Sequence, residues 1–171
     1  MISKKMNDAI NKQVAAEFYS AHLYLSMSSY LESIDLPGFA NWMRVQYQEE
    51  TFHGEKLFDH IIERDGRAVL IDFDAPPAEW DSVLAIFEEA YKHEQKVTSL
   101  INNLVDIAMA EKDHASYNFL QWFVDEQVEE EASVKTIVQQ LKMVNESKSG
   151  LFMMDREVGA RIFNAPASAG E

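Results

Sequence analysis

Apolar residues recur at intervals of three and four positions along four long stretches of the chain, the pattern of helices that each bury one face. We expect these helices to span about Lys4–Ile34, Phe39–Arg64 and Asp81–Ala110, with a fourth that ends near Val144. Glycine (6 residues) and proline (4 residues) are scarce in the 171-residue chain, which favours long uninterrupted helices. The pattern therefore predicts an all-α protein built on a four-helix bundle.

Short breaks separate the predicted helices. Leu36–Gly38 ends the first helix, because Pro37 lacks an amide donor and disfavours helical backbone in the residue before it. Asp65-Gly66 ends the second helix, and glycine suits the left-handed position that follows a helix. Glu111–Asp113 forms a tight turn before the fourth helix, with Asp113 as its N-cap.

One connection is much longer than the others. Residues Arg67–Trp80 contain two adjacent prolines and show no helical period, so we expect a loop that travels the length of the bundle. The third helix would then run parallel to the second. After a break at Ser147–Gly150, the segment Leu151–Phe163 has the spacing of a short fifth helix, followed by a flexible tail over 164–171. We expect residues 1–171 to form a single domain, with the bundle over about 4–144.

Each half of the chain carries the same set of polar positions on its apolar stripes. The two sets are offset by 77 residues, and in each half 33 residues separate the first member from the second. Charged groups are costly to bury, so a set of them that recurs on two buried stripes is stronger evidence for a functional site than any single member. The matched positions are Glu17, Glu50 and His53 in the first half and Glu94, Gln127 and Glu130 in the second, with the outer carboxylates Glu49 and Glu126.

The helical rise brings these stripe positions to one level. At about 1.5 Å per residue, each lies roughly 21–28 Å from the nearest hairpin turn, near the middle of its helix. Four carboxylates confined at one level need a counter-charge, which two divalent cations would supply. A mostly carboxylate set with one imidazole favours iron or manganese over copper or structural zinc. Glu50–His53 fits the Glu-x-x-His pattern of di-iron bundles, whereas Gln127–Glu130 departs from it.

Charge and composition exclude several classes of function. The net charge of −14 argues against nucleic acid and anionic membrane surfaces as partners, and it suits cations as cargo. The absence of cysteine removes disulfides, thiolate zinc sites and iron–sulfur clusters. No stretch approaches the roughly 20 apolar residues that cross a bilayer, and the first residues lack the apolar run of a secretory signal. We therefore expect a cytoplasmic protein.

The chain resembles the bacterial non-haem ferritins, ferritin-like di-iron four-helix bundles, from about Met6 to Glu157. The strongest match is the run NFLQWFVDEQVEEE at Asn118–Glu131, supported by QEETFH at Gln48–His53 and by EFYS at Glu17–Ser20. This family carries a glutamine at the position of Gln127, so the departure from the Glu-x-x-His pattern is part of the resemblance.

The resemblance implies a ferroxidase centre that binds two iron ions. One iron would be held by Glu17, Glu50 and His53, and the second by Glu94 and Glu130, with Glu50 bridging the pair. The centre would oxidise two Fe(II) ions with O₂ or H₂O₂, and the Fe(III) product would pass to a ferric mineral core.

The same resemblance assigns further residues around this pair. Gln127 would lie beside the second iron, and a third, more exposed iron position maps onto Glu49, Glu126 and Glu129, with Glu130 shared. Tyr24 lies seven residues after Glu17 on the same stripe and matches a family tyrosine. It would hydrogen-bond a ligand, supply an electron or simply pack in the core, and the sequence leaves these three roles open.

Members of this family assemble as hollow homo-oligomeric cages of 24 chains, with the fifth helix at the fourfold axis. Leu151–Phe163 would take that place here, with Arg156 and Arg161 as unusual charges on it. The resemblance thus predicts an iron-storage and detoxification protein without haem, in which exposed acids line the cavity.

Other di-iron and helical proteins are the alternatives. A bacterioferritin would carry its haem-ligating methionine beside the Glu-x-x-His histidine, where this chain has Phe52. A rubrerythrin-type peroxidase would need a thiolate-bound iron, and the chain has no cysteine. An oxidase acting on an organic substrate needs a substrate pocket, and a bundle that only self-assembles would not consume oxygen with Fe(II).

Overall fold

The computed structural model describes residues 1–144 and 147–164, and these residues form five α-helices and no strand. The bounds of the four long helices lie close to those expected, which confirms the all-α bundle. Over this part of the chain no helix is both long and apolar enough to span a bilayer. The predicted flexible tail lies, from residue 165 onward, outside the described residues. The helices are α1 (Lys4–Ser33), α2 (Pro37–Glu63), α3 (Val83–Glu111), α4 (His114–Val144) and α5 (Lys148–Val158).

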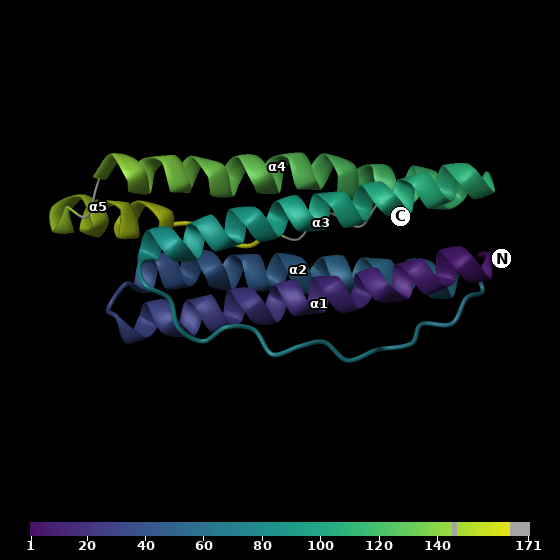
Figure 1. Ribbon diagram of the computed structural model, residues 1–171, viewed down its shortest axis with the longest axis horizontal. Coiled ribbons are helices and arrows are strands. Elements are labelled where there is room, and N and C mark those ends of the chain that lie inside the picture. Colours follow the sequence, from purple (N-terminus) through teal and green to yellow (C-terminus); the bar gives the residue numbers. More distant parts are fainter. Residues whose placement is uncertain (145–146, 165–171) are drawn as a thin grey trace.

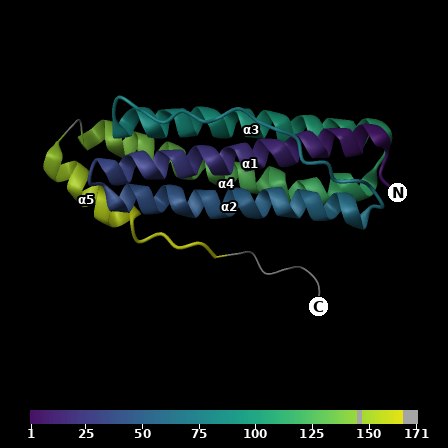
Figure 2. The same ribbon diagram turned by 90° about the horizontal axis from the view of Figure 1, so that it is seen from below.

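The four long helices form two antiparallel hairpins joined by one long crossover. The α1–α2 hairpin and the α3–α4 hairpin lie one above the other in Figure 1, and the crossover runs beside α1 from one end of the bundle to the other. The α3 helix therefore runs parallel to α2, as the length of the connection predicted (Figures 1 and 2). Side chains of α1 hold the crossover in place: Tyr30 donates to the Trp80 carbonyl at 2.5 Å, and the Asn11 amide pairs with Arg67 and Val69.

The end of α2 differs in one respect from the expectation. Asp65, with φ 55°, occupies the left-handed position, so the prediction that Gly66 does so is wrong. The Gly66 amide donates to the Ile61 carbonyl at 2.9 Å, which closes the helix end. A Cβ at Gly66 would lie 2.4 Å from the side-chain oxygen of Asn7, so a larger residue here would displace the Asn7 side chain, which accepts from the Arg67 amide. The predicted cap at Asp113 is confirmed, since its Oδ1 accepts from the Ser116 amide at 3.2 Å.

The fifth helix begins earlier and ends earlier than the apolar spacing suggested. Ser147 does not belong to a break but caps α5, because its Oγ accepts from the Gly150 amide at 3.2 Å. The helix ends at Val158, and the chain then turns back along α2. There the Asn41 side-chain amide donates to the carbonyls of Gly159 (3.2 Å) and Arg161 (3.0 Å).

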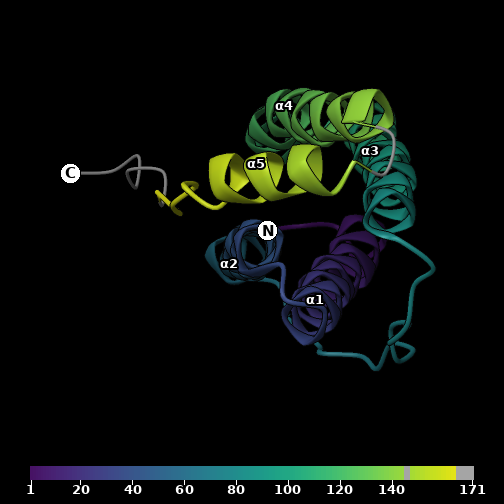
Figure 3. The same ribbon diagram turned by 90° about the vertical axis from the view of Figure 1, so that its left-hand side faces the viewer.

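The α5 helix supplies a cap that α2 lacks in its own sequence. Leu36, at the N-cap of α2, makes no side-chain cap hydrogen bond, and the Asp155 carboxylate of α5 accepts from the Phe39 amide at 2.9 Å instead. Gly38 permits this approach, because a Cβ there would lie 1.7 Å from the Asp155 carbonyl oxygen. The end-on view shows α5 lying across the end of the bundle between α2 and α4 (Figure 3).

Two apolar cores fill the bundle on either side of a polar layer. One core, toward α5, includes Met27, Phe39 and Phe87, and the other, toward the N-terminus, includes Ile10, Leu57 and Phe123. The six polar positions predicted to lie on the inward stripes are all buried. The buried polar residues of the layer come from the middle of the four long helices.

Removing the cap that α5 supplies should destabilise the fold. Asp155→Ala leaves the Phe39 amide without an acceptor and removes a negative charge from the N-terminus of α2. We expect the thermal unfolding midpoint to fall by about 2–4 °C, the effect of about 1 kcal/mol in a domain of this size. Calorimetry of Asp155→Ala beside Asp155→Asn, which keeps an acceptor oxygen, checks this. An unchanged midpoint in Asp155→Ala would show that the cap contributes nothing.

Candidate metal centre

Three predicted ligands converge in the polar layer. Glu17 of α1 and Glu50 and His53 of α2 are all buried, and their candidate ligand atoms lie within 4.8 Å of one another. The His53 Nδ1 is 3.4 Å from the Glu50 Oε2. Glu50 and His53 share one helix face because they are three residues apart. Glu17 reaches them from the antiparallel partner helix, which the short α1–α2 turn brings alongside.

These carboxylates lack the partners that buried oxygens normally have. The Gln13 amide donates to the Glu17 Oε1 at 3.0 Å. The Glu17 Oε2 and both oxygens of Glu50 have no hydrogen-bond partner among the described residues. Buried carboxylate oxygens without donors are strongly unfavourable unless a proton or a cation compensates them. The three oxygens and the His53 imidazole therefore form a set of donor atoms suited to a metal ion.

The second half of the layer is held by hydrogen bonds. Glu94 of α3 accepts from the Tyr24 hydroxyl, and the Gln127 amide donates to its Oε2 at 3.2 Å. Glu130 of α4 accepts from the Gln46 amide at 2.8 Å. Both carboxylates are almost fully buried, at 0% and 4% exposure. The structure thus places all six predicted stripe residues in the polar layer, and Tyr24 contacts one of them.

The outer carboxylates are arranged differently. Glu49 is half-buried, and its Oε2 forms an ion pair of 2.7 Å with the Arg161 Nη2. Glu126 is half-buried and Glu129 is exposed. Among the described residues, these three do not form a group with ligand atoms close enough to share one ion. The Arg161 guanidinium thus pairs with Glu49, one of the three carboxylates that the family resemblance places at a third iron position.

Burial and mutual repulsion raise the pKa values of the clustered carboxyl groups. Burial is the main cause in each case, and it raises the pKa of Glu17 to about 7 and that of Glu94 to about 8. The pKa of Glu50 rises well above its usual value, because burial is reinforced by the charges of its carboxylate neighbours. Burial also raises the pKa of Glu130, and the Gln46 hydrogen bond opposes that rise. Without a cation the layer therefore retains protons near neutral pH.

His53 is kept in the form that binds metals. Burial, and secondarily the charge of Lys56, lowers the pKa of His53 to about 4, so the imidazole is neutral at pH 7. The rings of Trp122 and Phe123 pack against it with centroid distances of 5.4 and 5.9 Å. This aromatic contact closes the side of the imidazole that faces α4.

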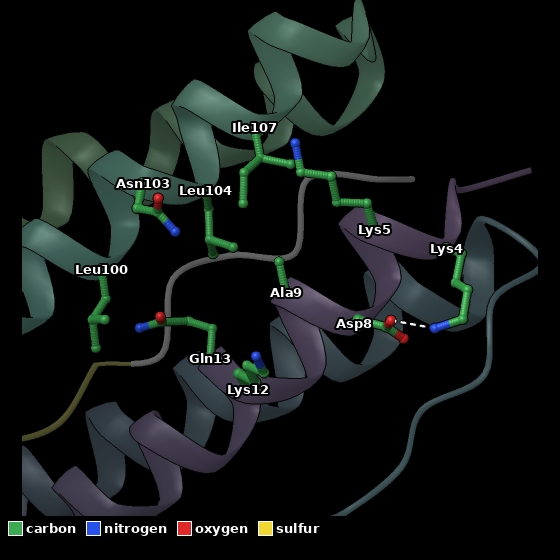
Figure 4. A pocket seen from close by; sticks show the side chains of 10 residues that line it. All are labelled: Lys4, Lys5, Asp8, Ala9, Lys12, Gln13, Leu100, Asn103, Leu104 and Ile107. Carbon is green, nitrogen blue, oxygen red and sulfur yellow. Dashed lines mark hydrogen bonds and ion pairs between the residues drawn. The ribbon is translucent and has the colours of Figure 1, made fainter.

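A basic groove lies on the α1–α3 side of the bundle, away from the side where α2 faces α4. A groove of about 560 Å³ lies between α1 and α3, with an apolar floor of Leu100, Leu104 and Ile107. Figure 4 shows side chains from both helices lining it, with Lys4 paired to Asp8. Gln13, which donates to Glu17, belongs to the same wall. Its remaining lysines, Lys5 and Lys12, oppose the approach of a cation to Glu17 from this side.

Three residues that contact the site belong to none of the motifs in the sequence: Gln13, Gln46 and Arg161. Gln46 lies four residues before Glu50, on the same face of α2, and this spacing was the available signal. Gln13 lies four residues before Glu17, a spacing at which helical side chains meet. The position of Arg161 depends on how the chain turns after α5, which no periodicity indicates.

A crossover four-helix bundle with carboxylates and an imidazole gathered at mid-height is the architecture of the ferritin-like proteins. The profile of that family, described as the ferritin-like domain, matches residues 7–144, and the chain belongs to this family. This confirms the class that the sequence motifs indicated.

Known members are similar over nearly the full chain. A bacterial non-heme ferritin from Bacteroides fragilis is 46% identical, with 94% of this chain and all of the relative covered. One from Staphylococcus saprophyticus is 40% identical, with 96% and 98% covered. Among solved structures, an open pore ferritin from the hyperthermophilic archaeon Archaeoglobus fulgidus superimposes with a TM-score of 0.94 at 56% identity, covering 95% of this chain and all of that chain.

The raised carboxyl pKa values predict how the stability of the metal-free protein depends on pH. The pKa values of Glu17 and Glu94 are about 7 and 8 in the folded state, above those of the unfolded chain, whereas burial lowers the pKa values of His53, His60 and His93 to about 4. The histidines oppose the carboxyl groups below about pH 6.5, so it is between about pH 6.5 and 8 that the folded protein holds more protons than the unfolded chain. Stability should therefore fall as pH rises through that interval. Thermal midpoints in the presence of a chelator measure this fall.

A matched variant separates the site from the rest of the titration. Glu94→Gln keeps the acceptor for Tyr24 but removes one titrating group, so its midpoint should fall less steeply over the same pH interval. Saturating divalent cation should remove or reverse the wild-type slope, because the cation competes with protons. Identical slopes for the two metal-free proteins would mean that Glu94 does not hold a proton in the folded state.

Proposed function

We propose that this ferritin stores iron and that the layer around Glu17, Glu50 and His53 is its ferroxidase centre. The observation that carries the proposal is the set of three buried carboxylate oxygens without donors beside a neutral imidazole. A bundle that only self-assembles gains no stability from such a layer, because apolar side chains of the same volume would stabilise the bundle better. The family membership and the non-heme ferritins among the relatives favour iron as the cation.

Fe(II) is the substrate of the proposed reaction. Glu17, Glu50 and His53 would bind one ion, and Glu50, with Glu94 and Glu130, would bind the second. Each Fe(II) gives up one electron, so an adjacent pair reduces O₂ to H₂O₂, or H₂O₂ to water, in one two-electron step. The protein brings the two ions together and leaves coordination positions open for the oxidant.

The residues around the layer would control its protons and geometry. Deprotonation of the carboxyl groups accompanies cation binding, because ion and proton compete for the same oxygens. The amide of Gln127 and the hydroxyl of Tyr24 fix the position of the Glu94 side chain. Tyr24 is thus placed to donate a hydrogen bond to a ligand, and its use as an electron donor is a further part of the proposal.

Charge asymmetry favours one route for the ions. Lysines line the groove on the α1–α3 side, whereas Glu49, Glu126 and Glu129 lie on α2 and α4. We expect Fe(II) or the Fe(III) product to pass on the acidic side, where Glu49, Glu126 and Glu129 would form a third, outer position. In a cage of 24 chains this side would face the mineral cavity.

Loss of a ligand should abolish oxidation without disrupting the fold. His53→Ala and Glu50→Ala each remove a donor atom from the first iron, so we expect initial rates of Fe(II) oxidation to fall by orders of magnitude. Stopped-flow absorbance measures these rates. His114→Ala, at an exposed position at the start of α4, is the matched control and should keep the wild-type rate. Wild-type initial rates in His53→Ala would reject the assignment.

Storage requires a closed assembly. We expect the purified chain of 19.6 kDa to form particles of several hundred kilodaltons at neutral pH, in keeping with a 24-subunit cage. Light scattering combined with gel filtration gives the mass. A monomer or dimer would rule out cage storage and would leave the oxidation test to decide the centre alone.

A further inference from the structure

The segment after α5 reaches into the edge of the proposed iron centre. Arg161 lies three residues beyond the end of α5, and the Asn41 side chain of α2 fixes its backbone through the Arg161 carbonyl at 3.0 Å. The guanidinium then points along α2 toward the polar layer. Its Cζ lies 4.6 Å from the ring centroid of Trp42, a stacking distance for a guanidinium on an aromatic face.

Two hydrogen bonds tie this guanidinium to the centre. One nitrogen donates to the Oε2 of Glu49 at 2.7 Å, and the other donates to the side-chain oxygen of Gln46. Gln46 is fully buried, and its amide nitrogen donates to Glu130 at 2.8 Å. Because the Gln46 oxygen accepts from Arg161, its amide must face Glu130. Arg161 is therefore connected to a proposed iron ligand through one buried side chain.

The pairing with Glu49 has a direct electrostatic consequence. Both side chains are largely shielded from water, at 24% exposure for Arg161 and 20% for Glu49. A guanidinium cannot lose its charge at any relevant pH, so it remains a competitor for this carboxylate. A cation that uses Glu49 must displace the guanidinium or share the carboxylate with it.

We propose that Arg161 is a positioning residue of the iron centre, whose guanidinium holds Glu49 as a built-in cation and so weakens iron binding at the outer position. This inference rests on the proposed function, because it assumes that Glu49, Glu126 and Glu129 bind iron after the inner pair is filled. The alternative is that Arg161 only docks the C-terminal segment on α2. Simple docking predicts no effect on ion affinity at the outer position.

Calorimetric titration of the assembled protein with Zn²⁺, which is not oxidised, tests the proposal. We expect a tight pair of ions per subunit and a weaker third ion in the wild type. Arg161→Gln removes the competing charge, so its third ion should bind about tenfold more tightly, as expected for one unit charge near a partly exposed site. Arg161→Lys keeps the charge without the bidentate geometry and should stay near the wild-type affinity.

Arg156→Gln is the matched control. It removes a guanidinium from α5, five residues before Arg161, and Arg156 is exposed and makes no hydrogen bond or ion pair among the described residues. Its third-ion affinity should equal that of the wild type. Equal third-ion affinity in Arg161→Gln and Arg156→Gln would overturn the proposal, and so would an Arg161→Lys protein that binds as tightly as Arg161→Gln. Absence of the tight pair in the wild type would instead refute the ferroxidase centre itself.

A second measurement covers the case in which Arg161→Gln does not fold. Wild-type crystals soaked in Zn²⁺ would locate the third ion by anomalous scattering. We expect the guanidinium to have left Glu49 wherever that ion is present. A third ion bound to Glu49 with the Arg161 contact intact would overturn the proposal.

Discussion

The structure depends on confining carboxylates in a dry layer between two apolar cores. Glu17, Glu50, Glu94 and Glu130 all lie at 4% exposure or less, and the side chains above and below them are apolar. Water cannot compensate these groups, so protons, hydrogen-bond donors or cations must do so. The two hairpins differ in this respect. Three of the four carboxylate oxygens of Glu17 and Glu50 have no partner among the described residues, whereas Glu94 and Glu130 accept hydrogen bonds from neighbouring side chains.

In the proposed centre, this asymmetry would leave the two metal positions unequally preorganised. The proposed first position has an imidazole that is neutral at pH 7 and three carboxylate oxygens that face no competing donor among the described residues. At the second, a metal must share Glu94 with Tyr24 and Gln127, and Glu130 with Gln46. An ion entering there exchanges hydrogen bonds for coordination bonds, so the net gain is smaller. The sequence repeat is thus symmetric in position but not in the local chemistry of its side chains.

Much of the fold and of the inner layer follows from sequence alone. The helical period sets which residues of α1 and α2 face inward, and the rise per residue sets their height, so the meeting of Glu17 with Glu50 and His53 is predictable. The start of α5 was missed because Ser147 reads equally well as a turn residue and as a cap. The ion pair of Arg161 with Glu49 was missed because it joins residues far apart in sequence through an irregular turn. Pairings of that kind carry no local pattern.

The contact between α1 and α2 differs from that between α2 and α4. The α1–α2 hairpin packs closely along its length, whereas no Cα atoms of α2 and α4 come within 8 Å over the described residues. Side chains fill the space between α2 and α4: His60 stacks on Phe119 at 3.8 Å between ring centroids, and the Lys56 Nζ lies 4.6 Å from the centroid of the Trp122 ring. Side-chain rotamer changes are smaller and faster movements than shifts of whole helices. A small ion crossing the wall between α2 and α4 would therefore wait only for side chains to swing aside, and the backbone scaffold could remain rigid throughout.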